Sequence, residues 1–199
     1  MTVHLPFSGG LIYQVSFWAA FLLWVCPEIV AAKMKRSTDP SKARDRGSLN
    51  LIAILWFAGM AGDFAFSFLL PGAAMLEWRH ELFFVGIFLM LSGSAFRWYS
   101  IAVLGKYFTF DVAVHAGQVV IEAGPYRYIR HPSYAGALVS LIGLGLALGN
   151  WVGLAVAVAC LGVAYAYRIP VEEEALLTRI GEPYRNYMSR TWRLIPFLF

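Results

Sequence analysis

The stretch YAGALVSLIGLGLALGNWVGLAVAVACLGVAYAY, residues 134–167, contains no charged side chain. A helix needs about 20 apolar residues to cross the ~30 Å hydrocarbon layer of a membrane, so this run is too long for one crossing. Gly149 and Asn150 interrupt it near the middle, and both residue types are typical of turns. The stretch therefore predicts a helical hairpin with a tight turn, whose two arms of roughly 15 to 17 residues are short for a membrane span.

A polar segment, GPYRYIRHPSY (residues 124–134), leads directly into the hairpin. Gly124 can adopt positive φ and Pro125 fixes φ near about −65°, so the chain is expected to turn there. Pro132 fits the first turn of the next helix, with His131 near its cap. The free amides of this helix end, among Arg, His and Tyr side chains, can bind an anion. An interfacial anchor of Tyr and Arg explains the same residues equally well.

The composition of the chain is that of an integral membrane protein. Hydrophobic residues make up 59% of it and charged residues 14%, and the mean hydropathy is +0.62, whereas soluble domains carry about 25% charged residues. Three further apolar regions, residues 11–32, 49–70 and 82–104, are each long enough for one crossing. We therefore expect an all-α integral membrane protein, a single domain of residues 1–199 with five transmembrane helices and a C-terminal cytoplasmic amphipathic helix.

The distribution of basic residues indicates how the chain is oriented in the membrane. Five crossings put residues 33–48, 105–133 and 168–199 on one side of the membrane. Of the 16 Lys and Arg residues, Arg79 alone then falls on the other side, provided that Arg97 snorkels toward the basic side. Because basic loops face the cytoplasm, the polar segment and the C-terminus are expected there and the N-terminus outside. This topology explains the net charge of +4, and no nucleic-acid partner is expected.

Charged residues follow the hairpin immediately. Arg168 and Glu172 are four residues apart, so they share one face if the helix continues. The hairpin returns its second arm beside the first, which brings Glu172 close to His131 and Tyr134. A positive helix end beside a carboxylate suits a zwitterionic amino acid or S-adenosylmethionine, whose sulfonium is a second cation. The alternative is a simple ion pair on a solvated helix face, and for Glu174 that alternative is preferred.

Two motifs thus flank the hairpin. The first is Gly124-Pro125-Tyr126 followed by Arg130-His131-Pro132-x-Tyr134-x-Gly136, and the second is Arg168 followed by Glu172-Glu173, Leu176, Gly181, Tyr184, Tyr187 and Pro196. Together they resemble the signature of the isoprenylcysteine carboxyl methyltransferase (ICMT) family. The resemblance covers residues 105–199, which it divides into a cofactor-binding loop, the hairpin and a cytoplasmic tail. Residues 1–104 are left as three N-terminal transmembrane helices.

The resemblance implies a role for each matching residue. S-adenosylmethionine would be the cofactor and S-adenosylhomocysteine its product. Arg168 matches the arginine that faces and steers the acceptor, and Glu172 matches the acid that holds the cofactor. The other cofactor-binding residues that it implies are Gln118, Val119, Val120, Ile121, Tyr126, His131, Pro132, Ser133 and Tyr134. The family often has His where Gln118 stands, and the backbone there could make the contact equally well.

The function that the resemblance implies is S-adenosylmethionine-dependent methyl transfer to a lipophilic acceptor. The carboxylate of an isoprenylcysteine-like substrate is the first expectation, and Arg168 could steer it by a bidentate contact. Related membrane methyltransferases act on phospholipid amines or small thiols, so these acceptors stay open. An NADPH-dependent membrane reductase and a non-catalytic membrane scaffold are further alternatives. The lipid bilayer is the expected partner, and the sequence leaves the oligomeric state open.

Other features predict structure rather than chemistry. Gly143-x-Gly145-x-x-x-Gly149 lies inside a membrane helix and predicts a close-packing face rather than a dinucleotide loop. Asp63 falls in the outer half of the second helix, where a buried hydrogen-bonding role is expected. The basic loop 33–46 either touches anionic lipid or simply reflects the topology. No metal site is expected, because the histidines lack metal-ligand spacing; they are His4, His80, His115 and His131.

Overall fold

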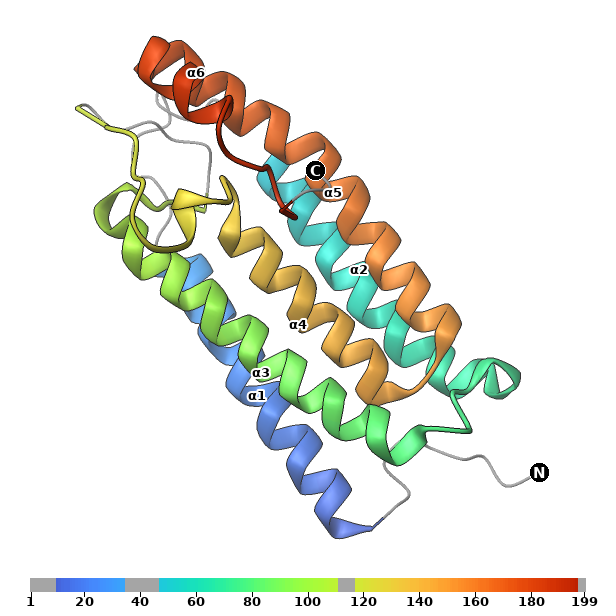
Figure 1. The fold of residues 1–199 in the computed structure, drawn as a ribbon. Helices are drawn as coiled ribbons and strands as arrows, with labels where there is room; N and C mark the ends of the chain where they lie inside the picture. The colour runs from blue at the N-terminus through green and yellow to red at the C-terminus, as the bar shows by residue number, and fades with distance from the viewer. Residues whose placement is uncertain (1–9, 35–46, 111–116, 197–199) are drawn as a thin grey trace.

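The computed structural model describes residues 10–34, 47–110 and 117–196, and these residues form a bundle of helices (Figure 1). The α-helices are α1 (Leu11–Met34), α2 (Ser48–Leu69), α3 (Arg79–Leu104), α4 (Pro132–Leu148), α5 (Trp151–Ile180) and α6 (Glu182–Met188). Three 3-10 turns lie between them, η2 (Pro71–Ala73), η3 (Gly105–Tyr107) and η4 (Gly124–Arg127). Over these ranges the β contacts are isolated bridges alone, which confirms the all-α class. The expected lipid contact of loop 33–46 falls almost wholly outside the described residues, as do His4 and His115.

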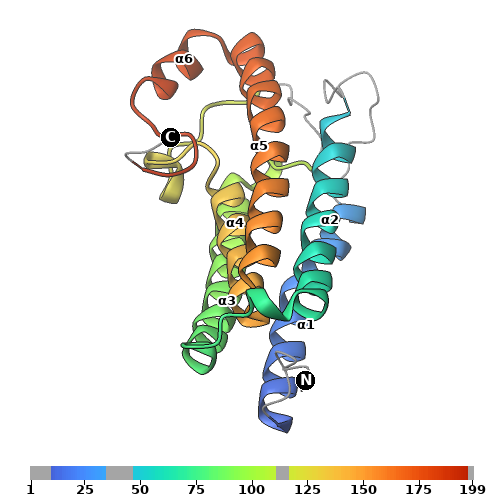
Figure 2. The ribbon, with the colours of Figure 1, turned by 90° about the vertical axis from the view of Figure 1, so that its right-hand side faces the viewer.

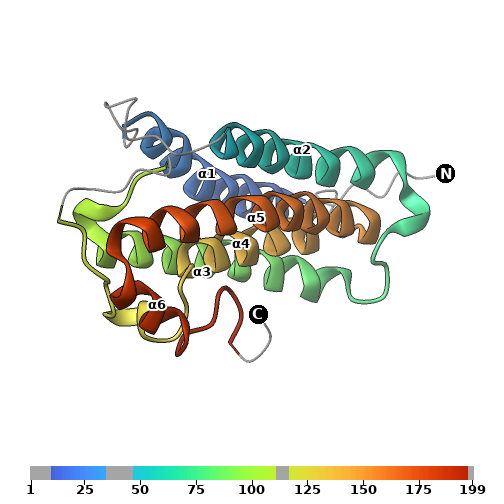
Figure 3. The same ribbon diagram turned by 90° about the horizontal axis from the view of Figure 1, so that it is seen from above.

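The α4–α5 hairpin occupies the centre of the bundle. α2 packs along α5, α3 packs along α4, and α1 packs against α3. Figure 3 shows this order from above, with the hairpin between α2 and α3. At one end of the bundle, α6 and the tail fold back beside η4 (Figure 2). Segments far apart in the sequence therefore meet where the polar segment enters the hairpin.

The protein is an integral membrane protein by the length and composition of its helices. Among the described residues, α1, α2, α3 and α5 are each long and apolar enough to cross a membrane. α4 is apolar but has 17 residues. A crossing by α4, and with it the total of five, stays a prediction.

The turn of the predicted hairpin is present and is built by two residues. Gly149 ends α4 with φ 70° and ψ 39°, a left-handed conformation that glycine adopts without a Cβ clash. The side-chain oxygen of Asn150 accepts hydrogen bonds from the backbone N–H groups of Val152 and Gly153, both at 3.0 Å. Its amide donates to two carbonyls at the end of α2, at 3.0 and 2.9 Å. The turn therefore caps α5 and also fastens the hairpin to α2.

The second arm is much longer than expected, because α5 runs on through Arg168 to Ile180. The expected C-terminal amphipathic helix is thus not a separate element but the last part of α5, and the short α6 follows it. Pro170 lies inside α5 without ending it. Its neighbours Ile169 and Val171 are both buried, and this packing holds the helix on either side of the proline.

Glycines let the backbones of α3 and α4 approach each other closely. A Cβ on Gly143 would lie 2.4 Å from the backbone nitrogen of Met90, and one on Gly136 would lie 2.7 Å from the carbonyl oxygen of Gly93. Gly145 does the same toward α5, where a Cβ would come within 2.7 Å of a leucine side chain. Two glycines of the motif, Gly143 and Gly145, therefore serve close packing as predicted, whereas its third member, Gly149, forms the turn.

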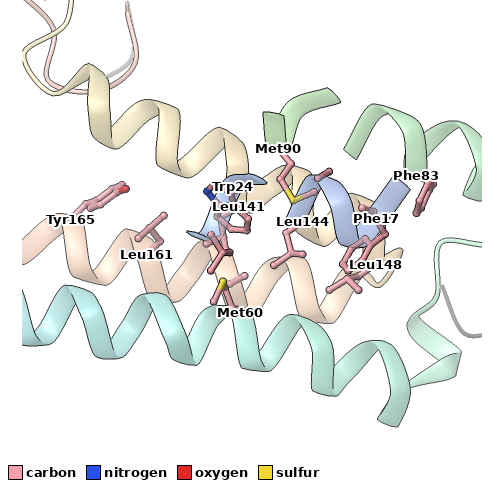
Figure 4. Packing of buried hydrophobic residues seen from close by; sticks show 14 of the residues in the cluster. Phe17, Trp24, Met60, Phe83, Met90, Leu141, Leu144, Leu148, Leu161 and Tyr165 are labelled. Atoms are coloured by element: carbon pink, nitrogen blue, oxygen red, sulfur yellow. The ribbon is translucent and has the colours of Figure 1, made fainter. Parts of the chain in front are cut away.

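One apolar cluster joins the five long helices (Figure 4). Its large members are Phe17, Trp24, Met60, Phe83, Met90, Leu141, Leu144, Leu148, Leu161 and Tyr165. Asp63 of α2 is fully buried against the start of α5, where a Cβ on Gly153 would lie 2.9 Å from its Oδ1. Neither carboxylate oxygen of Asp63 has a hydrogen-bond partner within the part of the chain that the structure describes, so the expected hydrogen-bonding role is not observed there.

Candidate active site

The start of α4 and the C-terminal part of α5 meet in space. The hydroxyl of Tyr134, in the first turn of α4, donates to Oε2 of Glu172 at 2.7 Å. His131, the residue before α4, has its Nδ1 4.0 Å from the same oxygen. Its ring stacks on that of Tyr134, with centroids 5.5 Å apart and 9° between the planes. The structure thus brings together the three residues that the hairpin argument predicts to converge.

Arg168 is buried in the same network, with 2% of its surface exposed. Its Nε donates to the hydroxyl of Tyr134 at 3.2 Å, and its terminal nitrogens donate to Ser48 Oγ at 2.6 Å and to the carbonyl of Phe110 at 2.5 Å. The direct approach of Arg168 to Glu172 is loose, at 4.0 Å. The Tyr134 hydroxyl therefore links the guanidinium to the carboxylate, and a simple ion pair on a solvated helix does not describe the arrangement.

A cavity of about 90 Å³ borders this network. Its walls come from the loop before η4, from η4 itself, from the start of α4, the end of α5 and α6. The lining includes nine of the residues expected to bind a cofactor, namely Gln118, Val119, Val120, Ile121, Tyr126, His131, Ser133, Tyr134 and Glu172. Pro132, which is fully buried in the first turn of α4, is not among the lining residues.

A second cavity, of about 180 Å³, shares Tyr134, Phe108 and Thr109 with the first. Most of its wall is apolar and comes from α1, α2, α4 and α5: Trp24, Ile29, Leu49, Ile52, Ala53, Trp56, Phe57, Ala137, Leu161 and Tyr165. Charged side chains also line it, and they are Glu28, Arg97 and Arg168. Sequence reasoning missed this cavity, because the helices that build half of it carry no motif.

Arg97 does not snorkel to the basic side, contrary to expectation. It is 8% exposed, its Nε donates to Glu28 Oε1 at 2.7 Å, and a terminal nitrogen donates to the carbonyl of Ser133 at 3.1 Å. A buried charge is costly unless it is paired, and Glu28 of α1 supplies the partner inside the bundle. The acidic residue that follows Pro27 in an apolar helix is the signal that could have revealed this pair.

Glu173 ties the C-terminal tail to the start of α4. It is 4% exposed, and its carboxylate accepts from Arg130 Nε at 2.8 Å and from Arg193 Nε at 3.0 Å, with His131 Nε2 at 3.4 Å. The backbone continues the contact, since Arg130 N–H donates to the carbonyl of Trp192 at 2.8 Å. Three successive glutamates suggest a solvated helix face, yet the middle one is buried here.

Buried tyrosines complete the wall of the smaller cavity. Tyr184 and Tyr187 of α6 and Tyr126 of η4 line it, and the hydroxyl of Tyr187 donates to the carbonyl of Tyr126 at 2.7 Å. Burial raises the pKa of all three phenols well above the usual value, so they remain neutral at physiological pH. The cavity therefore combines the Glu172 carboxylate with neutral phenols and with the Arg130 guanidinium, which is paired with Glu173, a set that suits a molecule carrying both a cation and hydrogen-bonding groups.

Comparison with known proteins gives a consistent result. Residues 85–178 match the model of the isoprenylcysteine carboxyl methyltransferase (ICMT) family. The chain is 28% identical over 117 residues to a probable protein-S-isoprenylcysteine O-methyltransferase of Oryza sativa subsp. indica, covering 58% of this chain and 61% of the relative. It is 29% identical over 134 residues to protein-S-isoprenylcysteine O-methyltransferase A of Arabidopsis thaliana, covering 65% and 66%.

A solved structure, that of the eukaryotic intramembrane Ras methyltransferase ICMT, is similar with a TM-score of 0.61 and 25% identity. The likeness covers 73% of this chain and 52% of that one. The chain thus spans between half and two thirds of the length of these relatives. Through residues 85–178, which supply both buried arginines, His131, Tyr134 and Glu172, this chain resembles the isoprenylcysteine carboxyl methyltransferase family.

Proposed function

We propose that this protein transfers the methyl group of S-adenosylmethionine to a lipophilic acceptor, and that the acceptor carries a carboxylate, as an isoprenylcysteine does. The observation that carries the proposal is the pair of cavities that share Tyr134, one bordered by Glu172 and the other mostly apolar with two buried arginines. The names of the relatives, which are protein-S-isoprenylcysteine O-methyltransferases, support the same reaction.

The donor set of the smaller cavity fits S-adenosylmethionine. Glu172 is a carboxylate with 30% of its side chain exposed, held in place by the Tyr134 hydroxyl, and it can pair with the ammonium group. The positive dipole end of α4, at His131 and Pro132, can face the carboxylate of the same molecule. When bound, S-adenosylmethionine supplies an electrophilic methyl group on sulfur, and the remaining tasks of binding, orientation and exclusion of water fall to the protein.

The larger cavity fits an apolar chain that ends in an anion. Its wall is mostly apolar, Glu28 pairs there with Arg97, and Arg168 supplies the positive charge. A carboxylate acceptor is already a nucleophile and needs no general base, so the guanidinium of Arg168 acts by orienting it. Because Tyr134 lines both cavities, the acceptor and the methyl donor can meet beside its ring, in a setting that excludes water.

Labelled methyl transfer tests the reaction. Purified protein in lipid is given labelled S-adenosylmethionine with an S-farnesylcysteine derivative, a phospholipid amine, an isoprenoid thiol or a small thiol. We expect label in a base-labile ester of the farnesylcysteine carboxylate. Label in an amine or thiol product would replace the proposed acceptor while keeping the reaction class, and absence of label from all four would overturn the proposed function.

Cofactor binding is tested separately by Glu172→Gln. A hydrogen bond to a charged group contributes about 1.5–3 kcal/mol, so the affinity for S-adenosylhomocysteine is expected to fall by about 10- to 150-fold. Titration calorimetry measures it. Glu174→Gln, at an exposed position two residues later, is the matched control and should bind as tightly as the unaltered protein. Equal affinity in the Glu172 variant would contradict the assignment of this cavity.

A further inference from the structure

Glu28 lies on the face of α1 that packs into the bundle. Phe17, Ala20, Trp24 and Ala31 are buried on that face, and Glu28 follows Trp24 by four residues, so the helix turns it the same way. Its side chain is 11% exposed. An apolar residue there would continue the packing of its neighbours, and a buried ion pair adds little stability because desolvation offsets its attraction. Packing alone therefore does not explain a charged residue at this position.

The guanidinium of Arg97, on α3, is held from two other helices. Glu28 accepts from its Nε at 2.7 Å, and the carbonyl of Ser133, in the first turn of α4, accepts from Nη1 at 3.1 Å. The side chain of Arg97 is 9% exposed, and Arg97 and Glu28 both line the larger cavity. Its remaining nitrogen, Nη2, has no hydrogen-bond partner among the residues that the structure describes. Because the guanidinium is a rigid planar fork, the two contacts fix the direction in which Nη2 points.

Arg97 and Arg168 are close neighbours across α4 and Phe110. The carbonyl of Ser133 accepts from Arg97, and the hydroxyl of the next residue, Tyr134, accepts from Arg168. The ring centroid of Phe110 lies 5.9 Å from the guanidinium carbon of Arg97, while its carbonyl accepts from Arg168 Nη2 at 2.5 Å. Both arginines line the same cavity. A carboxylate bound there can accept a hydrogen bond from each guanidinium.

We propose, resting on the methyl transfer proposed above, that Glu28 is a positioning residue for the acceptor. Its carboxylate holds Arg97 so that Nη2 donates to the carboxylate of the acceptor, to which Arg168 also donates. Glu28 itself contacts neither the acceptor nor the cofactor and acts through Arg97. It lies on α1, outside residues 85–178, which match the family model. In this chain the first helix therefore completes the binding of the acceptor.

The test is a double-mutant cycle on acceptor binding. Glu28→Ala, Arg97→Ala and the double variant are assayed for KM and kcat with an S-farnesylcysteine derivative, and calorimetry measures the binding of that acceptor and of S-adenosylhomocysteine. In Glu28→Ala we expect the acceptor dissociation constant and KM to rise by about tenfold or more, because Arg97 loses a charged partner, while the affinity for S-adenosylhomocysteine is unchanged. In the Arg97→Ala background the same substitution should add less than about twofold.

Two further variants sharpen the cycle. Glu28→Gln removes the charge but keeps an oxygen that can accept from Arg97 Nε, so its acceptor KM should rise less than that of Glu28→Ala. If the carboxylate merely repelled an anionic acceptor, the KM of Glu28→Gln would fall instead. Glu81→Ala, at an exposed position in the first turn of α3, is the matched control and should bind the acceptor as the unaltered protein does.

The outcomes separate this inference from the proposed reaction. Unchanged or tighter acceptor binding in the Glu28 variants, each shown to be folded by its thermal unfolding transition, overturns the positioning role even if methyl transfer is vigorous. Equal losses from Glu28→Ala with and without Arg97, or equal losses of acceptor and S-adenosylhomocysteine affinity, overturn it as well. If Glu28→Ala does not fold, the direction of the change in Glu28→Gln decides. If no acceptor is methylated, but acceptor binding follows the expected cycle, the positioning role stands and the proposed reaction falls.

Discussion

The hydroxyl group of Tyr134 connects the two halves of the candidate site, which are the guanidinium of Arg168 and the carboxylate of Glu172. It accepts from Arg168 Nε at 3.2 Å and donates to Glu172 Oε2 at 2.7 Å, while its ring lies between those of His131 and Tyr165. Removing the hydroxyl alone would leave the ring packing intact, which makes the linkage testable apart from the fold.

We expect Tyr134→Phe to lower kcat/KM by about 10- to 150-fold, because one hydrogen bond to a charged group is worth about 1.5–3 kcal/mol. The thermal unfolding midpoint should change little, since the stacked ring remains. The measurement is methyl transfer at varied acceptor concentration. Tyr128→Phe, at a position that is 67% exposed, serves as the control. Full activity of Tyr134→Phe would show that the hydroxyl group of Tyr134 plays no part in methyl transfer.

For Glu173 the prediction concerns the stability of the folded protein rather than its activity. Glu173→Gln removes the negative charge that Arg130 and Arg193 share, and leaving the buried Arg130 without its partner costs about 3–5 kcal/mol. The unfolding midpoint in detergent should fall accordingly, and susceptibility of the tail to protease should rise. Glu174→Gln, next to it but exposed, should behave like the unaltered protein. Equal effects of the two substitutions would argue that the contacts of Glu173 with Arg130 and Arg193 do not hold the tail in place.

The contrast between Glu172, Glu173 and Glu28 shows what sequence could and could not predict of the site. Glu172 was predicted to reach His131 because hairpin geometry and helix periodicity suffice for neighbours along two connected arms. Glu173 pairs with Arg130, just before α4, and with Arg193 of the tail, and Glu28 pairs with an arginine on another helix. Neither partnership follows from local pattern, since both depend on how separate helices pack.

The contact between α3 and α4 rests on glycines rather than on large side chains. We expect Gly143→Ala to destabilise the protein by about 1–3 kcal/mol, because the added Cβ would lie 2.4 Å from the backbone of Met90 and the helices must move apart. Gly162→Ala in α5 is the control, since a Cβ there meets nothing within 4 Å and should stabilise the helix by up to about 1 kcal/mol. The thermal unfolding midpoints of both variants are the measurement. A loss of stability in the control alone would refute the conclusion that the close contact of Gly143 with α3 stabilises the protein.

Hydropathy predicted the helices well and their ends less well. The turn at Gly149 and Asn150 was predictable because a glycine with positive φ and an asparagine cap act locally. The continuation of α5 through Pro170 and the charged residues after it was not predictable, because burial of Ile169 and Val171 in the folded protein outweighs the proline. Local signals decide turns, while packing decides how far a helix extends.

The orientation of the whole bundle in the membrane is predicted from its basic residues and can be tested by labelling from one side. With Cys26 and Cys160 replaced by Ala, single cysteines are placed at Glu77, between α2 and α3, and at Glu182, at the start of α6; both positions are exposed. We expect a membrane-impermeant thiol reagent to label Glu77→Cys in intact cells and Glu182→Cys only after permeabilisation, because basic segments stay in the cytoplasm. The reverse pattern would place the candidate site outside.

The shortness of α4 has a consequence for where the reaction takes place. Its 17 residues extend about 26 Å, less than the ~30 Å hydrocarbon layer, whereas its neighbours α3 and α5 have 26 and 30 residues. If α4 crosses the membrane as predicted, His131 and Tyr134, at the start of this shorter helix, lie in a dip below the lipid headgroups, between longer helices. Hydrophobic mismatch deepens such a dip in thick bilayers and makes it shallower in thin ones. Under the proposed function, lipid acyl length and sterol content would then control how easily the water-soluble cofactor reaches its binding site.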